Sequence, residues 1–433
     1  MSKIWKSSAG FSFFTLISRI FGYVRDLVLT SLLGASSAHD IFVVIFRIPN
    51  VFRSFFGEGA LAQSLVPSII EAKENLNSFL NQVFTLLFIT LLTFVVLAET
   101  FPDIFISLFA PGFYDDPDKL KSASDFLRLV FPYILLISFT AFFGSIQNSK
   151  KVFQVVAATP IIFNLTLIVF ALLSNEFSLE ILGISILVAG LIQLAINFSV
   201  VIYFNYFPKF VLNFDREILR SFFNKLIPAF FAAGIYQLNV LVDTIYASFL
   251  VTGSPTWLYL SERLIQFPLG LFGVALALVA LPNMTELFLE KRMTELKNQS
   301  TKATRILFLI GLACVLGAFL FGELAISLLF LRGEFTSFDV GMTFLALQGY
   351  AFSMLFILPQ KFFNSIFFAI SKTNMVVVTG LISLLANIVF NYYFIYQLDF
   401  GHFGLALATS ISSGIIFIIS YAWLRNQGIL KII

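Results

Sequence analysis

The sequence predicts an all-α polytopic membrane protein with about twelve transmembrane helices arranged in two six-helix lobes. Three observations predict this class: a composition that only lipid can accommodate, an alternation of basic and non-basic connections, and motifs that recur in both halves of the chain. The lobes are expected to span residues 1–208 and 209–433. They are expected to be related by a pseudo-two-fold axis along the membrane normal.

The composition excludes a soluble protein. Of the 433 residues, 59% are hydrophobic and 12% are charged, against roughly 25% charged residues in an ordinary soluble domain. The mean hydropathy is +0.94 and there are 57 phenylalanines, so too few polar residues remain to cover the apolar surface. About twelve spans of roughly 20 to 25 residues leave only short connections, which excludes a large catalytic domain outside the membrane. The single cysteine, Cys314, excludes internal disulfides and multi-cysteine metal sites.

Apolar runs separated by turn and charge clusters define the expected helices. In chain order they are expected at 11–33, 39–69, 79–109, 124–147, 154–174, 180–206, 218–251, 257–289, 303–331, 339–370, 375–397 and 402–424. The breaks between them include the acidic stretch at 111–119, the charged stretch at 290–299 and the short connection at 398–402.

Basic residues outside these helices fall almost entirely on one side. One set of chain ends and connections holds Lys3, Lys6, Lys73, Lys150, Lys151, Lys209, Arg216, Arg220, Lys225, Lys291, Arg292, Lys297, Lys302, Arg305, Lys372, Arg425 and Lys431. The alternate connections hold only Lys119, Lys121 and Arg332. Because basic connections stay on the cytoplasmic side, both termini are expected in the cytoplasm, and the number of spans is expected to be even.

Markers recur in order at offsets between 215 and 222 residues. LFAPGF (108–113) corresponds to FLRGEF (330–335), FFGEGALAQSLVP (55–67) to LFGVALALVALP (271–282), and Asp26 with Ser31 to Asp243 with Ser248. Two six-helix repeats of the same topology are the architecture of an alternating-access transporter with its site between the halves. Convergent similarity among Phe- and Leu-rich helices is the alternative explanation.

Arginines inside the expected helices are the main candidates for binding. Arg19 and Arg25 are six residues apart and therefore about 120° apart around the first helix, which suits a helix that lines an aqueous cleft. In the second helix Pro49 is expected to cause a kink, after which Asn50 and Arg53 share one face. Helix eight places Arg263 just inside its outer end.

If Arg25, Arg53 and Arg263 converge on one cavity, they would form a binding site for phosphate or pyrophosphate, because guanidinium groups bind such anions in bidentate fashion. Asp40 is the expected counter-ion. The alternative is that each arginine snorkels to the surface or bridges two helices. Glu58 fits either a helix-end charge or a proton-coupling group, and the roles of Arg47 and Lys361 stay open.

A second cluster lies in the second half of the chain. Asp243, the pair Asn387 and Asn391 four residues apart, and Thr409 offer carboxylate, amide and hydroxyl oxygens, which suit a hard cation such as sodium. Hydrogen bonds between membrane helices explain the same residues equally well.

Catalytic functions find little support. His39 and His402 both fall in outer connections, Cys314 lies in an apolar helix, and no GxSxG or Walker-type loop is present. Asp115, Asp116 and Asp118 could belong to a metal-dependent lipid transferase, but a solvated turn between Pro111 and Pro117 explains them better. Nucleic-acid binding is not expected, because no basic stripe exists outside the short positive connections.

The block at 18–67, SRIFGYVRDLVLTSLLGASSAHDIFVVIFRIPNVFRSFFGEGALAQSLVP, resembles the N-terminal signature of the MurJ (MviN) lipid II flippases. Further similar stretches are APGF (110–113), FPYILLIS (131–138), SFLVTGSPTWLYLSERLIQFPLGLFGVALALVALP (248–282) and GEFTSFD (333–339). The resemblance covers essentially the whole chain. It also implies membership of the larger group of multidrug and polysaccharide-lipid exporters, whose two six-helix lobes agree with the repeat.

The resemblance implies transport of lipid II, an undecaprenyl-pyrophosphate-linked muropeptide, from the inner to the outer leaflet of the bacterial inner membrane. By motif position it implies substrate-binding roles for Arg19, Arg25, Asp40, Asn50, Arg53 and Arg263, and it matches Glu58 to another polar motif residue. It implies a sodium site at Asp243, Asn387, Asn391 and Thr409, with an amide at Asn391 where the family also uses a carboxylate. Family members usually continue with two more helices that help form a groove for the lipid tail, whereas this sequence ends at WLRNQGILKII. A minimal core that suffices, a partner that supplies the groove and a truncated chain are the alternative explanations.

Two other functions remain as alternatives. The first is export of a different polyprenyl-pyrophosphate-linked sugar or cation-coupled drug antiport. Drug antiport would favour fewer cavity arginines and more carboxylates or aromatic residues. The second is a membrane scaffold for cell-wall synthases, for which neutralising the cavity arginines would have no effect.

Overall fold

The computed structural model describes residues 3–56, 60–72 and 75–431, and within these residues the elements are helices without any strand. Among these described residues, seven helices are long and apolar enough to cross a membrane, and an eighth span results if α15 and α16, bent by 47°, are counted together. The expected all-α membrane class is confirmed. Four expected spans fall outside this apolar set, at 11–33, 39–69, 218–251 and 257–289. They carry the candidate arginines, Asp40 and Asp243.

The chain divides into two compact units, Met1–Gln237 and Leu238–Ile433. The first unit contains α1 (Lys3–Leu33), α2 (Ser37–Ile45), α3 (Arg47–Phe56), α4 (Ala60–Ala72), α5 (Leu76–Thr100), α6 (Pro102–Phe109), the 3₁₀ turn η2 (Pro111–Asp115), α7 (Pro117–Val130), α8 (Tyr133–Ser149), α9 (Gln154–Leu173) and α10 (Leu179–Tyr203). The division falls inside α11 (Arg216–Ser248), whereas the lobes expected from the sequence divide at 208/209, in the connection before α11.

The second unit contains the remaining part of α11 and seven more α-helices. These are α12 (Ser254–Pro268), α13 (Ala275–Leu289), α14 (Met293–Phe330), α15 (Ser337–Ala351), α16 (Met354–Ala369), α17 (Thr373–Tyr392) and α18 (Gly401–Asn426), with π-helical segments at η3 (Leu269–Val274) and η4 (Tyr393–Gln397).

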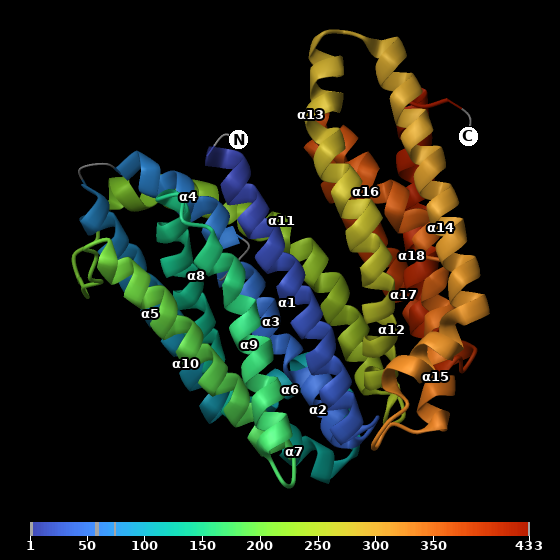
Figure 1. Ribbon diagram of the computed structural model, residues 1–433, viewed down its shortest axis with the longest axis horizontal. Coiled ribbons are helices and arrows are strands. Elements are labelled where there is room, and N and C mark those ends of the chain that lie inside the picture. The colour runs from blue at the N-terminus through green and yellow to red at the C-terminus, as the bar shows by residue number, and fades with distance from the viewer. Residues whose placement is uncertain (1–2, 57–59, 73–74, 432–433) are drawn as a thin grey trace. The chain divides into compact units, whose positions relative to one another are not determined.

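The helices of each unit pack in the same pattern. In the first unit α2 packs on α7, α4 and α5 on α8, and α8 and α9 on α10. In the second unit α12 packs on α15, α13 and α14 on α16, and α16 and α17 on α18 (Figure 1). The recurring sequence markers therefore correspond to a recurring helix arrangement inside each unit.

Prolines explain two of the breaks within expected spans. The helix expected at 39–69 is interrupted at Phe46, between α2 and α3. Pro49 has no N–H to donate to the carbonyl of Ile45, so the helical hydrogen-bond ladder is broken at this point. The helix expected at 124–147 is broken between Val130 and Tyr133, around Pro132.

The core of each unit forms around corresponding helices. In the first unit Leu127, Ile134 and Phe142 of α7 and α8 are completely buried. In the second unit α16 provides Phe362, Phe363, Ile366 and Phe367, which lie at the centre of a cluster with residues of α13, α14 and α18. Burial of large apolar side chains holds each bundle together, while outward-facing apolar side chains remain exposed, as expected for lipid contact.

The connection that leads into α11 is bonded along α5. The backbone N–H groups of Lys209, Val211 and Asp215 donate to side chains of Asn81 (2.9 Å), Thr85 (3.1 Å) and Gln82 (2.7 Å). The ring of Phe210 packs against Phe84 and Phe88. Asp215 then accepts from the N–H of Glu217 in the first turn of α11, so this connection is an ordered part of the first unit.

Candidate functional site

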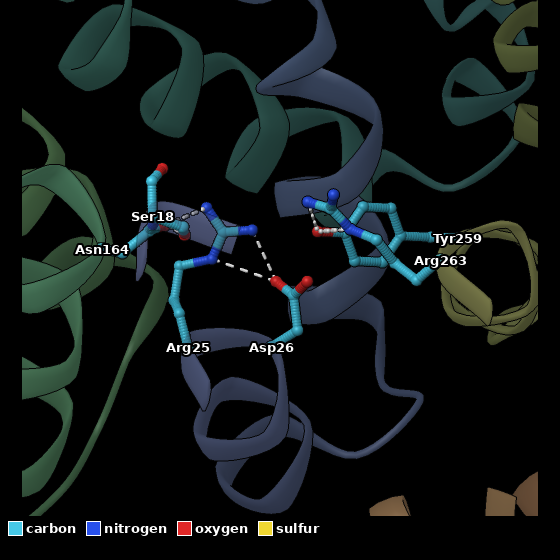
Figure 2. Close-up of polar contacts among 6 residues, drawn as sticks. All are labelled: Ser18, Arg25, Asp26, Asn164, Tyr259 and Arg263. Carbon is cyan, nitrogen blue, oxygen red and sulfur yellow. Dashed lines mark hydrogen bonds and ion pairs between the residues drawn. The ribbon is translucent and has the colours of Figure 1, made fainter. Parts of the chain in front are cut away.

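Arg25 lies on α1 and is held against α9. Its Nε and Nη2 atoms donate to Oδ1 of Asp26 at 3.0 and 2.5 Å, and its Nη1 atom donates to Oδ1 of Asn164 at 3.1 Å (Figure 2). The amide of Asn164 donates in turn to the carbonyl of Ser18, at 3.3 Å. Both charged side chains are nearly fully buried. A guanidinium group at this depth requires such a partner, because an uncompensated buried charge is strongly destabilising.

Asp26 and Asp40 both form buried ion pairs in the first unit. Asp26, the next residue along α1, is the carboxylate that compensates Arg25. Asp40 is completely buried on α2, and its Oδ2 atom forms an ion pair with Nζ of Lys119 at 3.5 Å. Lys119 also lies 4.6 Å from the centre of the Phe113 ring, in cation–π contact. Asp40 therefore has Lys119 as a buried ion-pair partner, and its role as counter-ion of the candidate arginines stays a prediction.

Arg53 and Arg19 have no carboxylate partner among the described residues. Arg53 is half-buried on α3 and Arg19 is exposed on α1. Neither forms a hydrogen bond or an ion pair with another residue in the described parts of the chain. Asn50 lies three residues before Arg53 on the same helix and is half-buried. Glu58 lies outside the described residues. Of these three candidate arginines, Arg25 is therefore fixed by partners, whereas Arg19 and Arg53 have none among the described residues.

Arg263 belongs to the second unit and folds back over its own helix. Its Nε and Nη2 atoms donate to the hydroxyl of Tyr259 at 3.2 and 2.8 Å, and its guanidinium carbon lies 5.0 Å from the centre of the same ring (Figure 2). Tyr259 precedes it by one turn of α12. The aromatic ring and the hydroxyl of Tyr259 fix the direction of the guanidinium group.

Three of the four residues expected to bind a cation, Asp243, Asn387 and Asn391, are joined by hydrogen bonds in the second unit. Nδ2 of Asn391 donates to Oδ1 of Asp243 at 2.9 Å and to Oδ1 of Asn387 at 3.0 Å, joining α17 to α11. Asn391 is completely buried, and its own Oδ1 atom has no hydrogen-bond partner among the described residues. Thr409 on α18 donates its hydroxyl proton to the carbonyl of Leu405, at 3.2 Å. Two oxygens therefore converge on one point, which the amide nitrogen of Asn391 occupies.

Sequence reasoning missed Asn164, Lys119 and Tyr259. An amide within the apolar run of α9 was a usable signal for Asn164, because a polar group inside such a helix needs a partner. Lys119 was assigned to a connection. Its place in the first turn of α7, behind the capping residue Asp116, orients it inward, but nothing in the sequence connects it to Asp40.

Comparisons with known proteins agree with this arrangement. The family model described as "Lipid II flippase MurJ" matches residues 29–432. A probable lipid II flippase MurJ of Buchnera aphidicola subsp. Acyrthosiphon pisum is 32% identical over 416 residues, which cover 94% of this chain and 81% of that protein. One from Vibrio cholerae serotype O1 is 32% identical over 444 residues, covering 99% of this chain and 84% of that protein.

The chain belongs to the MurJ family of lipid II flippases.

Solved structures support the same assignment. A lipid II flippase MurJ in an inward closed conformation matches with a TM-score of 0.85 and 26% identity, over 97% of this chain and 88% of that one. An inward-facing multidrug transporter of the MATE family matches with a TM-score of 0.76 and 14% identity, over 95% of this chain and 94% of that one, and shows the shared fold. The MurJ relatives are named as flippases, so the family consists of transporters rather than enzymes.

Proposed function

We propose that this protein moves lipid II from the inner to the outer leaflet of the bacterial cytoplasmic membrane by alternating access. The observation that carries the proposal beyond family membership is Arg53, a half-buried arginine in an expected span that lacks a partner among the described residues. A guanidinium group inside a membrane is costly unless it meets water, protein or an anionic ligand. The pyrophosphate of lipid II is such an anion, and it suits bidentate binding by arginine.

The candidate residues would divide the work of holding that pyrophosphate. Arg53 and Arg19 supply uncommitted positive charge, and Arg263 supplies a guanidinium group oriented by Tyr259. Arg25 supplies donors in a direction fixed by Asp26 and Asn164. In this proposal Asn50 contributes an amide beside Arg53. Asp40 acts through Lys119, to which it is paired.

The proposal includes the orientation of the chain and its partners. The distribution of basic connections favours both termini in the cytoplasm. The translocated precursor must then reach enzymes that polymerise it outside the membrane, so cell-wall synthases are the protein partners we propose. Membrane lipids surround the exposed apolar helix faces.

Sodium is the coupling ion that we propose for the second unit. Oδ1 atoms of Asp243 and Asn387 already converge on one point, and turning over the Asn391 amide would direct a third oxygen there. The repeat supports this assignment. Asp26 lies 217 residues before Asp243 and is its counterpart in the repeat. There the guanidinium group of Arg25, which is a cation, bridges Oδ1 of Asp26 and the amide oxygen of Asn164. Oxygen ligands of this kind suit a hard cation.

The main test measures lipid II on the outer leaflet of cells that are depleted of their own flippase and express this chain. We expect the unmodified chain to restore exposure and Arg53→Ala to abolish it, because the pyrophosphate loses a ligand in the membrane interior. Arg332→Ala, which removes an exposed arginine outside the candidate site, serves as the matched control. Full activity of Arg53→Ala at normal expression would contradict the pyrophosphate-binding role. Failure of the unmodified chain would contradict the function itself.

The sodium proposal is tested with Asn391→Asp in proteoliposomes. A second carboxylate beside Asp243 should strengthen cation binding, so flipping by this variant should reach half of its maximal rate at a sodium concentration roughly tenfold lower than for the unmodified chain. Thermal unfolding with and without sodium provides an independent measure of binding. Identical responses to sodium and to choline in both proteins would exclude the site.

A further inference from the structure

Lys361 is a cation inside the second unit with no described counter-ion. It lies on α16, within the bent span formed by α15 and α16, eight residues before the end of α16 at Ala369. Its side chain is half-buried and forms no hydrogen bond or ion pair with another residue of 3–56, 60–72 or 75–431. At the helical rise per residue this position is about 12 Å inside the end of the span. A charge at this depth is retained where it meets water or an anion.

The surroundings of Lys361 place it against an irregular segment of the neighbouring span. A Cβ atom at Gly273 would lie 3.9 Å from Cγ of Lys361. Gly273 belongs to the π-helical segment η3 that follows Pro268. One turn further along α16, Ser365 donates to the carbonyl of Ala277, at 3.0 Å. Segments of π-helix inside α-helices occur frequently at functional sites, and this one continues the span that carries Arg263.

The residue before Lys361 adds an unsatisfied acceptor. Gln360 is 6% exposed, and its Nε2 atom donates to Oδ1 of Asn364 at 3.0 Å. Its Oε1 atom is buried without a hydrogen-bond partner among the described residues. A buried carbonyl oxygen in this state is destabilising unless a donor reaches it. Positions 360 and 361 therefore supply an acceptor and a cation at consecutive positions of α16, about 100° apart around the helix, where they can reach different groups of one large ligand.

We propose that Lys361 binds an anionic group of the transported substrate, with Gln360 Oε1 accepting a hydrogen bond from an adjacent hydroxyl or amide. This inference rests on the proposed function and extends it to a contact made within the second unit alone. Two groups of lipid II have the required chemistry: a carboxylate of its peptide and its pyrophosphate. A peptide carboxylate has amide N–H groups nearby, and a pyrophosphate has sugar hydroxyls nearby, so both match an acceptor beside a cation.

The test measures substrate binding by the full chain in lipid nanodiscs, using lipid II and undecaprenyl pyrophosphate as separate probes. We expect Lys361→Gln to weaken lipid II binding by about 10- to 100-fold, the range for losing a charged hydrogen bond, and Lys361→Arg to retain most of it. Lys372→Gln removes an exposed lysine that follows the same span and should leave binding unchanged. A loss with lipid II alone identifies the peptide carboxylate, and an equal loss with both probes identifies the pyrophosphate.

Thermal unfolding separates ligand binding from a structural role. Without ligand, Lys361→Met should unfold at the same or a higher temperature, because it removes a charge that lacks a described partner, while the stabilisation by lipid II should shrink. Unchanged lipid II affinity in Lys361→Gln would overturn the proposal. A lower unfolding temperature of Lys361→Met with full stabilisation by lipid II would do the same. Absence of lipid II binding by the unmodified chain would instead refute the proposed function.

Discussion

Arg25 and Asp26 carry opposite charges at adjacent positions of α1, where side chains normally point away from each other. The long side chain of Arg25 bends back so that its guanidinium group reaches both Asp26 and Asn164 (Figure 2). The carboxylate thus serves to hold Arg25 in one direction while keeping the pair close to neutral. If Arg25 binds the substrate as proposed, this fixed direction reduces the side-chain entropy that is lost on binding.

Asp26→Asn tests this arrangement at the level of one residue. The amide removes the compensating charge from a buried guanidinium group, so the free energy of unfolding should fall by about 3–5 kcal/mol. Thermal unfolding of the purified protein measures the change. Asp125→Asn, on the exposed face of α7, should have almost no effect. Equal stability of the Asp26→Asn variant and the unmodified protein would show that Asp26 is not the group that compensates Arg25.

The candidate site could be predicted from the sequence as a set of residue types, but not as a set of partners. Arginines in apolar helices are visible in the sequence because of their cost in a membrane. Arg25 is paired with Asn164, 139 positions away, and with its neighbour Asp26, at a spacing that rarely forms a pair. Arg263 is paired with the hydroxyl of Tyr259. Only the contact with Asn164 depends on which helices become neighbours, and that is decided by packing of the whole unit. The other two contacts lie within one helix and depend on the direction that the arginine side chain takes.

At the level of elements, α14 packs on α16 through a glycine. A Cβ atom at Gly311 would lie 2.6 Å from the carbonyl oxygen of Met354 and 3.0 Å from the Cα atom of Leu355. Both are backbone atoms, which cannot move aside as a side chain can. The absence of a side chain at Gly311 therefore allows these two helices to approach closely, as small residues do at membrane helix interfaces.

Gly311→Ala should separate α14 from α16 and lower the free energy of unfolding by roughly 1–3 kcal/mol. Gly317, on the same helix, is the matched control, because a Cβ atom there meets nothing within 4 Å. Gly317→Ala should stabilise the protein by up to about 1 kcal/mol through its higher helix propensity. Thermal unfolding of the two variants decides the matter, and a stabilising Gly311→Ala would refute the close contact.

The expected spans agree with the observed helices because apolar runs bounded by charged connections are a strong signal in a membrane protein. Their internal breaks were only partly foreseen. Pro49 marks the break between α2 and α3, since proline removes a backbone donor. The bend between α15 and α16 follows Ala351, and the nearest proline, Pro359, comes several residues later. That bend is a property of packing in the second unit rather than of a local residue.

For the whole molecule, the side of the membrane on which each connection lies is testable with two exposed lysines. In a Cys314→Ala background, Lys121→Cys should react with a membrane-impermeant maleimide in intact cells, because its connection belongs to the set expected outside. Lys372→Cys should react only after the membrane is permeabilised. Labelling in the opposite order would contradict a cytoplasmic location of both termini.

The connection before α11 has a mechanical consequence for the transport cycle. Three backbone N–H groups bond it to α5, and Phe210 is wedged against Phe84 and Phe88. Because it is bonded to α5 in this way, we expect the connection to move together with α5 rather than as a flexible linker. If transport involves bending near this connection, we expect it further along the chain, within α11, whose interior contains Pro228.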